Sequence, residues 1–569
     1  MSVGSFCLVL HGHLPYVLRH GTWPHGEEWL FEAAAETYLP LLATLRECEF
    51  LNGRPRVTMG LTPVLLEQLS HDDFKTRFRE YLDERIDRAR GDRAEFERAH
   101  DVHFASLAAG WEAYYEERAR QFDAIHRDIP AAYAALARDG ILEILTSCAT
   151  HGYLPLLAED ASVYAQVRAG LASSQRILGL DPSGIWLPEC AYRPPGPWYA
   201  PVPWGPPRNR PGTEQVIAAS GLDHFFVENH QVEQSRSEWV NNQGWQKVDW
   251  EEAAKYPNRG WRDTLEPVRV ASNGAEPGST VAFARDRDIC ERVWSGNVGY
   301  PADGAYLEFH KKHGERNGLR YWRVTDHHLD LGGKQAYDPA AIAGRVHEHA
   351  THFCNEIRRR LHEHHGRTGR RGVVVACFDA ELFGHWWFEG PRFIRDVMLT
   401  LNSAPDVEVC TSAAVLQHHP PDKAAALPEG SWGDGGDHRV WVNERVKWVW
   451  DIEYRCEATF GKLTFNLPWR ERADLRGLLE LAARELLLLQ ASDWIFIIAR
   501  DQAVDYGTKR VVQHADRFEQ ITDIVTRVAG GASVDHLSEL EQWAIRDAVV
   551  HDVVFPRIDL NWWNTSQGC

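Results

Sequence analysis

The sequence predicts an α/β protein: a barrel of parallel strands that carries an inserted helical domain and a C-terminal all-helical domain. Three observations lead to this fold class. Short apolar runs rich in β-branched and aromatic residues recur over residues 1–410, and helical patterns lie between many of them. A charged, strand-free stretch interrupts this alternation once. The strand pattern then stops at about residue 420, and helical patterns follow.

The apolar runs are the candidate strands. They cover residues 6–10, 57–60, 141–146, 184–187, 223–227, 281–284, 373–378 and 407–410. Strands that are apolar throughout are typical of parallel sheets, which are buried on both faces. Helical patterns such as 29–45 and 163–178 complete βαβ units. Seven or eight such units favour an α/β barrel.

The remaining segments divide the chain into expected domains. Residues 71–138 are charged and helix-rich, so we expect an inserted helical domain inside a barrel formed by residues 1–70 and 139–418. Apolar stripes at helical spacing predict that residues 419–569 form a C-terminal helical domain. The length of 569 residues is consistent with one large barrel and two attached domains.

Composition and charge exclude several classes of function. The chain carries 62 Lys and Arg against 81 Asp and Glu, a net charge of −19 that disfavours binding to a phosphate backbone. No apolar run approaches the ~18 residues of a membrane span, and the run 6–10 is too short for a signal peptide. The ten scattered cysteines form no C-x-x-C pair, which is typical of free thiols in a reducing cytoplasm. We therefore expect a cytoplasmic protein that binds neither nucleic acid nor membrane, and a monomer is compatible with the sequence.

Polar residues follow several candidate strands at the carboxyl end, where a barrel places its active site. His11 and His13 follow the first run, His151 the third and Glu189 the fourth, while Asp379 follows the run 373–378. Two carboxylates that flank a glycosidic bond are the pair that glycoside hydrolysis requires, and their separation decides between retention and inversion. The sequence does not give that separation.

Each of these residues also has a structural interpretation. Glu189 could be a capping or ion-paired carboxylate, and Asp379 could be an N-cap at a strand–helix turn. Glu381 follows Asp379 closely enough to be confused with it. His11 and His13 could form half of a metal site, because alternate strand residues face the same way, but no acidic ligand lies beside them. We expect no metal and no other cofactor; a sugar hydroxyl is the better partner for His11, and His13 could also be a buried structural histidine.

Several motifs resemble those of glycoside hydrolase family 57 and, within it, of the 1,4-α-glucan branching enzymes. The strongest are WLPECAYR at 186–193 and FDAELFGHWW at 378–387. The others are HGHLPY at 11–16, WPHGEEW at 23–29, HGY at 151–153, VWS at 293–295, the loop 432–443 and SDW at 492–494. The similarity runs from near residue 5 to beyond residue 506, which is most of the chain.

The resemblance implies a (β/α)7 barrel, with Glu189 as the nucleophile and Asp379 as the general acid/base. It also implies which residues meet the substrate: sugar contacts by His11 and His151, a glucan groove lined by Trp29, Trp294, Trp432 and Trp441, and a C-terminal segment with Asp493 and Trp494 that reaches the site. With His13 and Trp386, these are the candidate substrate-binding residues. Trp448, Trp450 and Trp562 fall outside the motifs and are expected to be packing residues, so the 23 tryptophans divide between groove and core.

Two stretches depart from the family pattern. The family's branching enzymes carry a catalytic loop with a Tyr near its tip. The corresponding region here lies within residues 231–278, where Tyr256 is the only Tyr. The stretch 194–211 is longer and richer in Pro than is usual in the family, and because Pro removes backbone donors we expect no regular structure there.

The predicted function is that of a retaining 1,4-α-glucan branching enzyme acting on an α-glucan polymer such as amylose or glycogen. It would cleave an α-1,4 bond and transfer the chain to a glucan 6-hydroxyl. The same carboxylate pair gives an α-amylase when water is the acceptor and a 4-α-glucanotransferase when a 4-hydroxyl is. A non-catalytic glucan-binding protein and a metal-dependent deacetylase are the remaining alternatives.

Overall fold

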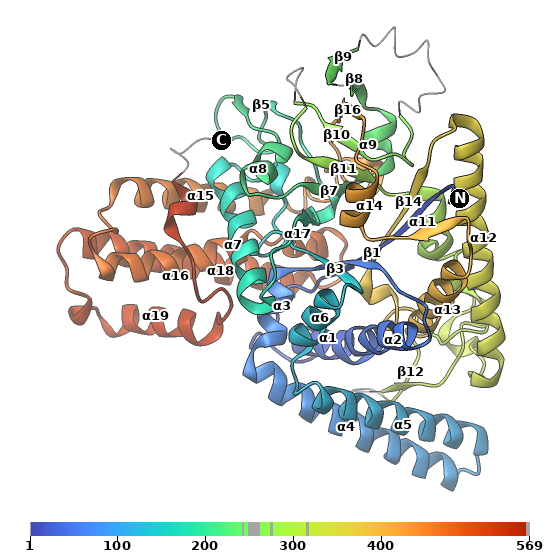
Figure 1. Ribbon diagram of the computed structural model, residues 1–569. Coiled ribbons are helices and arrows are strands. Elements are labelled where there is room, and N and C mark those ends of the chain that lie inside the picture. The colour runs from blue at the N-terminus through green and yellow to red at the C-terminus, as the bar shows by residue number, and fades with distance from the viewer. Residues whose placement is uncertain (1, 242–243, 249–261, 273–276, 315–317, 565–569) are drawn as a thin grey trace.

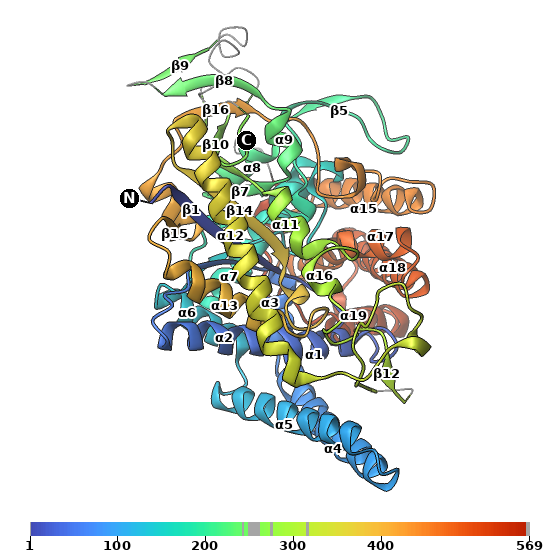
Figure 2. The ribbon, with the colours of Figure 1, turned by 90° about the vertical axis from the view of Figure 1, so that its right-hand side faces the viewer.

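A computed structural model describes residues 2–241, 244–248, 262–272, 277–314 and 318–564. A strand barrel occupies the centre, and the C-terminal helices cover one side of it (Figure 1). A pair of long helices, α4 (Asp72–Arg98) and α5 (Val102–Ala124), projects from one end. In the turned view this pair stands clear of the barrel, at the end of the molecule opposite to the strands β8 (Arg236–Asn241) and β9 (Trp245–Lys247) (Figure 2).

Seven parallel strands within the described residues form the barrel. They are β1 (Gly4–Gly12), β2 (Val57–Leu61), β3 (Leu142–Leu145), β4 (Gly184–Ile185), β7 (His224–Val227), β11 (Val281–Ala284) and β14 (Gly372–Asp379). Hydrogen-bonded neighbours run in the orders β14-β1-β2-β3 and β4-β7-β11. A parallel bridge between Thr146 and Ile185 joins β3 to β4. The backbone N–H of Asp286, just after β11, donates to the carbonyl of Val375 in β14 at 2.8 Å and closes the ring. The (β/α)7 barrel that the resemblance implied is therefore confirmed.

The eighth predicted strand lies outside the ring. It forms β15 (Val407–Val409), which pairs in parallel with residues 4–6 at the start of β1. Because β2 pairs only with residues 8–12 of the long β1, the first residues of β1 remain open to a further neighbour. β15 takes that place.

Alternation along the strands sorts their side chains between two faces. In β1, Cys7 and Val9 belong to the barrel interior, while the residues between them pack outward against the helices. β14 repeats the pattern with Val375 and Cys377 inside. The interior is completed by Leu145, Trp186, Phe226 and Phe283. Two residues further along each strand, the same alternation places His11 of β1 and Asp379 of β14 on the inward face. These two residues are register partners at the mouth of the barrel.

Helices follow the strands and cover the outer face. The predicted helix 29–45 is divided into α1 (Glu27–Ala33), a π-helical turn (Ala34–Tyr38) and α2 (Leu39–Phe50). The α4–α5 pair lies in the chain between α3 (Pro63–Ser70) and α6 (Ile129–Arg138), and α6 packs against β3 and α7. The other covering helices include α7 (Asp160–Leu178), α8 (Thr213–Ala219), α11 (Arg287–Trp294), α12 (Ile342–Thr368) and α13 (Gly390–Asn402).

The C-terminal region is mostly helical. It contains α15 (Lys447–Asn466), α16 (Ala473–Leu489), α17 (Ser492–Ala499), α18 (Val504–Ala529) and α19 (Glu539–His551). One strand departs from the all-helical prediction: β16 (Lys423–Ala426) pairs with β8 and with β10 (Val268–Val270), so it extends the sheet beyond the barrel. No helix among the described residues is long and apolar enough to cross a membrane.

The Pro-rich stretch 194–211 also departs from expectation, because it contains a short hairpin. β5 (Gly196–Trp198) and β6 (Arg208–Arg210) pair antiparallel. Four of the prolines, at 201, 203, 206 and 207, fall in the connection between the strands, and only Pro197 lies within one. The loss of ladder donors is therefore confined to one residue of a two-stranded hairpin.

Candidate active site

Glu189 lies in a tight turn directly after β4. Residues Pro188–Cys190 form a single 3-10 turn, in which Glu189 has φ 61° and Cys190 has φ 49°. Such left-handed conformations cost a non-glycine residue roughly 1–3 kcal/mol and persist where surrounding contacts fix them. Here the N–H of Trp432 donates to the carbonyl of Glu189 at 3.0 Å, and the N–H of Cys190 donates to Leu187 at 2.9 Å. The strained turn is thus held from two sides.

The carboxylate of Glu189 has two close polar neighbours. The indole N–H of Trp432 donates to Oε2 at 2.7 Å, and Nδ1 of His151 lies 3.7 Å from Oε1. Burial raises the pKa of Glu189 to about 7, and the charge of Asp493 adds to this, while the Trp432 hydrogen bond and the charge of His13 lower it. A buried carboxylate with a pKa near neutrality is a candidate catalytic group.

Asp379 ends β14 on the opposite side of the ring from β4, with β7 and β11 between them on one side. Burial raises the pKa of Asp379 well above its ordinary value, and the charges of Glu381 and Glu189 raise it further. The charge of ionised Glu189 disfavours a second charge nearby and so helps Asp379 to keep its proton. An ionised Glu189 beside a protonated Asp379 is the pair of states that a nucleophile and a general acid require.

Two neutral histidines meet beside Glu189. Nε2 of His11 and Nε2 of His151 lie 3.1 Å apart, and the ring of His11 stacks on Trp186 with centroids 4.8 Å apart. Burial lowers the pKa of both histidines well below the ordinary value. Nδ1 of His11 is buried and has no hydrogen-bond partner among the described residues. A buried N–H without an acceptor is costly, so the favoured tautomer of His11 carries its proton on Nε2. His11 then donates to His151, whose Nδ1–H donates to Ser492 Oγ at 3.1 Å.

His13 at the same mouth differs from these two histidines, because its pKa is raised. Its Nε2 contacts Asp493 Oδ1 at 2.8 Å, and its Nδ1 contacts Thr62 Oγ1 at 3.0 Å. Burial opposes protonation, but the charge of Asp493 and the hydrogen bond to it outweigh burial and raise the pKa of His13. The resulting imidazolium lowers the pKa of both Glu189 and Asp379.

Glu381 and Asp379 lie in different environments, although they are close in sequence. β14 ends at Asp379, and the following 3-10 turn (Ala380–Leu382) carries Glu381 into a buried position. There its Oε1 accepts from the hydroxyl of Tyr38 and, at 3.1 Å, from the backbone N–H of His13. Glu381 therefore holds the segment after β1, whereas Asp379 faces the barrel mouth.

Few side-chain atoms at this site are free to bind a metal ion. His13, His151 and Asp493 bring one possible ligand atom each to within 4.8 Å of one another. However, the ring nitrogens of His151 already face His11 and Ser492, and those of His13 face Thr62 and Asp493. A protonated His13 offers no lone pair. The cluster suits a hydrogen-bonded network better than a metal centre.

The candidate groove tryptophans fall into two groups. Trp386 is 41% exposed and Trp29 and Trp294 are half-buried. The indole N–H of Trp294 donates to the carbonyl of Cys377, two residues before Asp379, at 3.4 Å. Trp29 packs edge-on against Tyr506.

Trp441 and Trp494 are instead buried, with 1% and 0% exposure. Trp441 packs against Tyr153, because its Gly-rich loop folds inward, and Trp494 lies beneath Arg510. Neither exposes a face to a sugar. The expected groove position of Trp441 and the expected substrate contact of Trp494 are therefore corrected to packing roles. Tyr256 lies outside the described residues.

The family profile of glycosyl hydrolase family 57 matches residues 7–428, which include both carboxylates and all of the barrel strands except the first three residues of β1. The chain belongs to this family. A second profile, described as the C-terminal part of 1,4-alpha-glucan branching enzymes, matches residues 454–563.

Individual relatives agree with this membership of family 57. A 1,4-alpha-glucan branching enzyme of Thermococcus kodakarensis is 38% identical over 544 residues, which cover 95% of this chain and 76% of the relative. The crystal structure of a branching enzyme from Pyrococcus horikoshii matches with a TM-score of 0.88 at 34% identity, covering 99% of this chain and 97% of that chain. An alpha-amylase from Thermotoga maritima matches with a TM-score of 0.80 at 27% identity, covering 98% and 99%.

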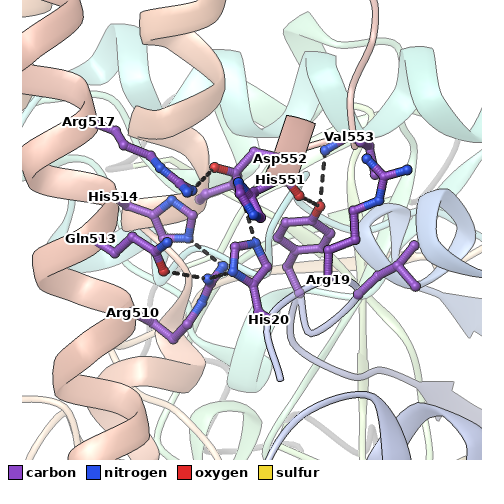
Figure 3. Close-up of polar contacts among 12 residues, drawn as sticks. Arg19, His20, Arg510, Gln513, His514, Arg517, His551, Asp552 and Val553 are labelled. Atoms are coloured by element: carbon purple, nitrogen blue, oxygen red, sulfur yellow. Dashed lines mark hydrogen bonds and ion pairs between the residues drawn. The ribbon is translucent and has the colours of Figure 1, made fainter. Parts of the chain in front are cut away.

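A buried polar network connects the segment after His13 to the C-terminal helices (Figure 3). Arg510 of α18 donates to Nδ1 of His20 and, at 2.7 Å, to Nε2 of His514. His20 then donates from Nε2 to Asp552 at 2.9 Å, and His514 donates from Nδ1 to Glu485 at 2.8 Å. Because a guanidinium only donates, both histidines must be neutral acceptors. Burial and then Arg510 lower the pKa of His20 to about 3 and that of His514 well below its ordinary value.

The network positions both partners of the His13–Asp493 pair. The hydroxyl of Tyr16, three residues after His13, donates to the carbonyl of His551 at 2.6 Å and accepts from the N–H of Val553 at 3.0 Å. On the other side, Arg510 stacks 5.4 Å from the ring centroid of Trp494, the neighbour of Asp493. The loop after β1 and the start of α17 are thus held by one cluster.

Several residues of the candidate site were not predicted from the sequence. Thr62 directly follows β2, so the search at strand ends would have found it had it been applied to the second run. Ser492 stands in the SDW motif beside Asp493. Tyr38 and Arg510 lie within helices, and only the tertiary fold brings them to the site.

Proposed function

We propose that this chain is a 1,4-α-glucan branching enzyme that works by a retaining mechanism. The observation that carries the proposal is the pair Glu189 and Asp379, which end strands on opposite sides of the barrel and both have a pKa raised by burial. The similarity to named branching enzymes along the whole chain supports the choice of reaction.

In the first half-reaction, Asp379 protonates the oxygen of an α-1,4 glycosidic bond. Glu189 attacks the anomeric carbon, the bond to the leaving chain breaks, and a covalent glycosyl-enzyme forms. The hydrogen bond from Trp432 stabilises the ionised form of Glu189 before the attack. The raised pKa of Asp379 keeps its proton available near neutral pH.

In the second half-reaction, Asp379 accepts a proton from the 6-hydroxyl of another glucan chain. That oxygen attacks the anomeric carbon, Glu189 leaves as a carboxylate, and an α-1,6 branch results with the configuration retained. Esterification removes the negative charge of Glu189, one of the charges that raise the pKa of Asp379. Asp379 therefore becomes more acidic after the first step and serves as the base in the second.

An α-amylase is the second candidate. The Thermotoga maritima alpha-amylase is 27% identical to this chain and covers nearly all of it. The same carboxylates would serve, and the difference would lie in whether water or a sugar hydroxyl reaches the intermediate. A 4-α-glucanotransferase differs only in using a 4-hydroxyl.

For the cellular setting, we propose a cytoplasmic enzyme of glycogen biosynthesis with an α-glucan polymer as its partner. The nine described cysteines are all free and buried, which fits a reducing compartment. The net charge of −19 does not hinder an uncharged polymer, whereas it disfavours nucleic acid.

The test uses amylose. After incubation with the protein, the product is debranched with an isoamylase, and chain lengths and α-1,6 proton signals are measured. New α-1,6 signals support branching, reducing sugar without them supports an amylase, and longer linear chains support a glucanotransferase. The variant Glu189→Gln should lose all three activities, and full activity in it would overturn the assignment of the nucleophile.

A further inference from the structure

A hollow of about 380 Å³ lies beside the active site, between the β5–β6 hairpin and the loop 429–442. The hairpin contributes Trp198 and Tyr199, and the loop contributes Glu429, Asp437 and Arg439. This is the Pro-rich hairpin that departs from the family pattern, so the hollow includes a part of the chain that the reaction described above does not use.

The hollow shares its walls with the catalytic centre. Arg193 lines it and stands four residues after Glu189 in the same segment. On the opposite wall, the loop that bears Asp437 and His438 also bears Trp432, which donates to Glu189. His438 in turn contacts the hydroxyl of Tyr153 at 2.8 Å. The hollow and the catalytic centre are therefore lined by parts of the same two segments.

One buried donor in the hollow is unused. Arg193 is 6% exposed, and its terminal nitrogens donate to the backbone carbonyls of Pro194 at 3.0 Å and Pro211 at 2.7 Å. Its Nε–H has no hydrogen-bond partner within the part of the chain that the structure describes. A buried donor without a partner costs about 1–3 kcal/mol, so the environment of Arg193 is polar but incompletely satisfied.

The charges that line the hollow balance. Arg193 and Arg439 supply two cations, and Glu429 and Asp437 supply two carboxylates. Arg439 is paired with Asp437 at 2.7 Å, and His438 contacts Glu429 at 2.8 Å. An anion in the hollow would be repelled by both carboxylates, and no excess of positive charge would compensate. A neutral ligand with several hydroxyls would find hydrogen-bond donors and acceptors side by side.

An exposed aromatic ring stands at the rim. Tyr199 is 70% exposed, and the neighbouring Trp198 is fixed by a hydrogen bond from its indole to Pro155 at 2.9 Å. Arg210 covers the ring of Trp198 at 4.7 Å, which leaves Tyr199 as the free aromatic face. A ring that is exposed at the edge of a polar hollow is suited to stack on the apolar face of a glucose unit.

We propose that this hollow is a second α-glucan subsite, in which Tyr199 stacks on a glucose unit and Glu429 and Asp437 bind its hydroxyls. The subsite holds a chain several glucose units away from the bond that is cleaved. It therefore favours long polymers over short oligosaccharides. This inference rests on the proposed function, because the ligand is the same polymer.

The test compares long and short substrates with the full-length protein. In Tyr199→Ala, the KM for amylose should rise about three- to ten-fold, while the KM for maltotriose should change by less than about two-fold. Glu429→Gln should likewise raise the KM for amylose and change the KM for maltotriose by less than about two-fold. Trp543→Ala removes another exposed ring, 53% exposed, from α19, far from the hollow in sequence, and should leave both values unchanged.

Binding is measured in parallel, as the retardation of each variant in native gels that contain amylose. Reduced retardation of Tyr199→Ala relative to wild type and Trp543→Ala supports the subsite. Equal retardation and equal KM for amylose in all variants overturn it, and so does displacement of amylose by inorganic phosphate, which would identify an anion site. Wild-type protein that converts no amylose overturns the proposed function itself, which separates that failure from failure of the subsite alone.

Discussion

The substitution Trp432→Phe separates two roles of one side chain. It keeps an aromatic ring in the loop but removes the indole N–H, which donates to Glu189 Oε2 at 2.7 Å. That hydrogen bond favours the ionised form of Glu189 and lowers its pKa, against the effect of burial. Without it the pKa must rise.

The size of the rise follows from the strength of the bond. A hydrogen bond to a charged group contributes about 1.5–3 kcal/mol. At 1.36 kcal/mol per pKa unit, its loss raises the pKa of Glu189 by about 1–2 units. Starting from about 7, the ionised fraction at pH 7 falls from about a half to between about a tenth and a hundredth, so the rate falls roughly 5- to 50-fold.

The assay is the dependence of kcat/KM for amylose on pH between 5 and 10. The acid limb of the profile should move upward by about 1–2 pH units, and activity should recover where Glu189 is again ionised. Trp469→Phe is the control, because its indole N–H donates at 2.9 Å to a backbone carbonyl within the C-terminal helices.

A uniform loss of activity at every pH, with the acid limb in place, would refute the reasoning. Trp432 would then act on the sugar alone and not on the ionisation of Glu189. An upward shift in Trp469→Phe as well would point to a general change in stability.

Three further predictions concern the acid, the buried network and the absence of a metal. Asp379→Asn should lower α-1,6 branch formation by about 10²–10⁴-fold, and activity near wild type would contradict its role. The pKa of His20 is lower in the folded protein, so acid favours unfolding from about pH 6.5 down to about pH 3. His20→Gln, which can keep both hydrogen bonds, should lose about 1.4 kcal/mol less unfolding free energy per pH unit over this window, as measured by urea titration, and equal slopes would contradict this. Dialysis against a chelator should leave the rate unchanged, because the ring nitrogens of His13 and His151 already have partners, and a loss restored by zinc would revive the metal site.

The barrel was predictable because its strands are apolar throughout. Seven of the eight apolar runs became barrel strands, and the rule that strand ends carry the site led to His11, Glu189 and Asp379. The eighth run looked the same in sequence. Its exclusion depends on how far β2 extends along β1, which is a matter of register and not of composition.

The local sequence did not predict features that depend on contacts with distant segments. Trp441 stands among Gly and polar residues, yet its loop folds against Tyr153 and buries the ring. The charge of His13 depends on Asp493, which lies 480 residues away. Neither contact leaves a periodic signal, so only the assembled fold shows them.

Glu189 and its neighbours contact groups that are synthesised long after them. Trp432, Ser492 and Asp493 all follow the last strand of the barrel in the chain, and they contact Glu189, His151 and His13, respectively. A nascent chain that ends before Trp432 lacks all three partners. The candidate site is therefore completed only when translation has passed Asp493.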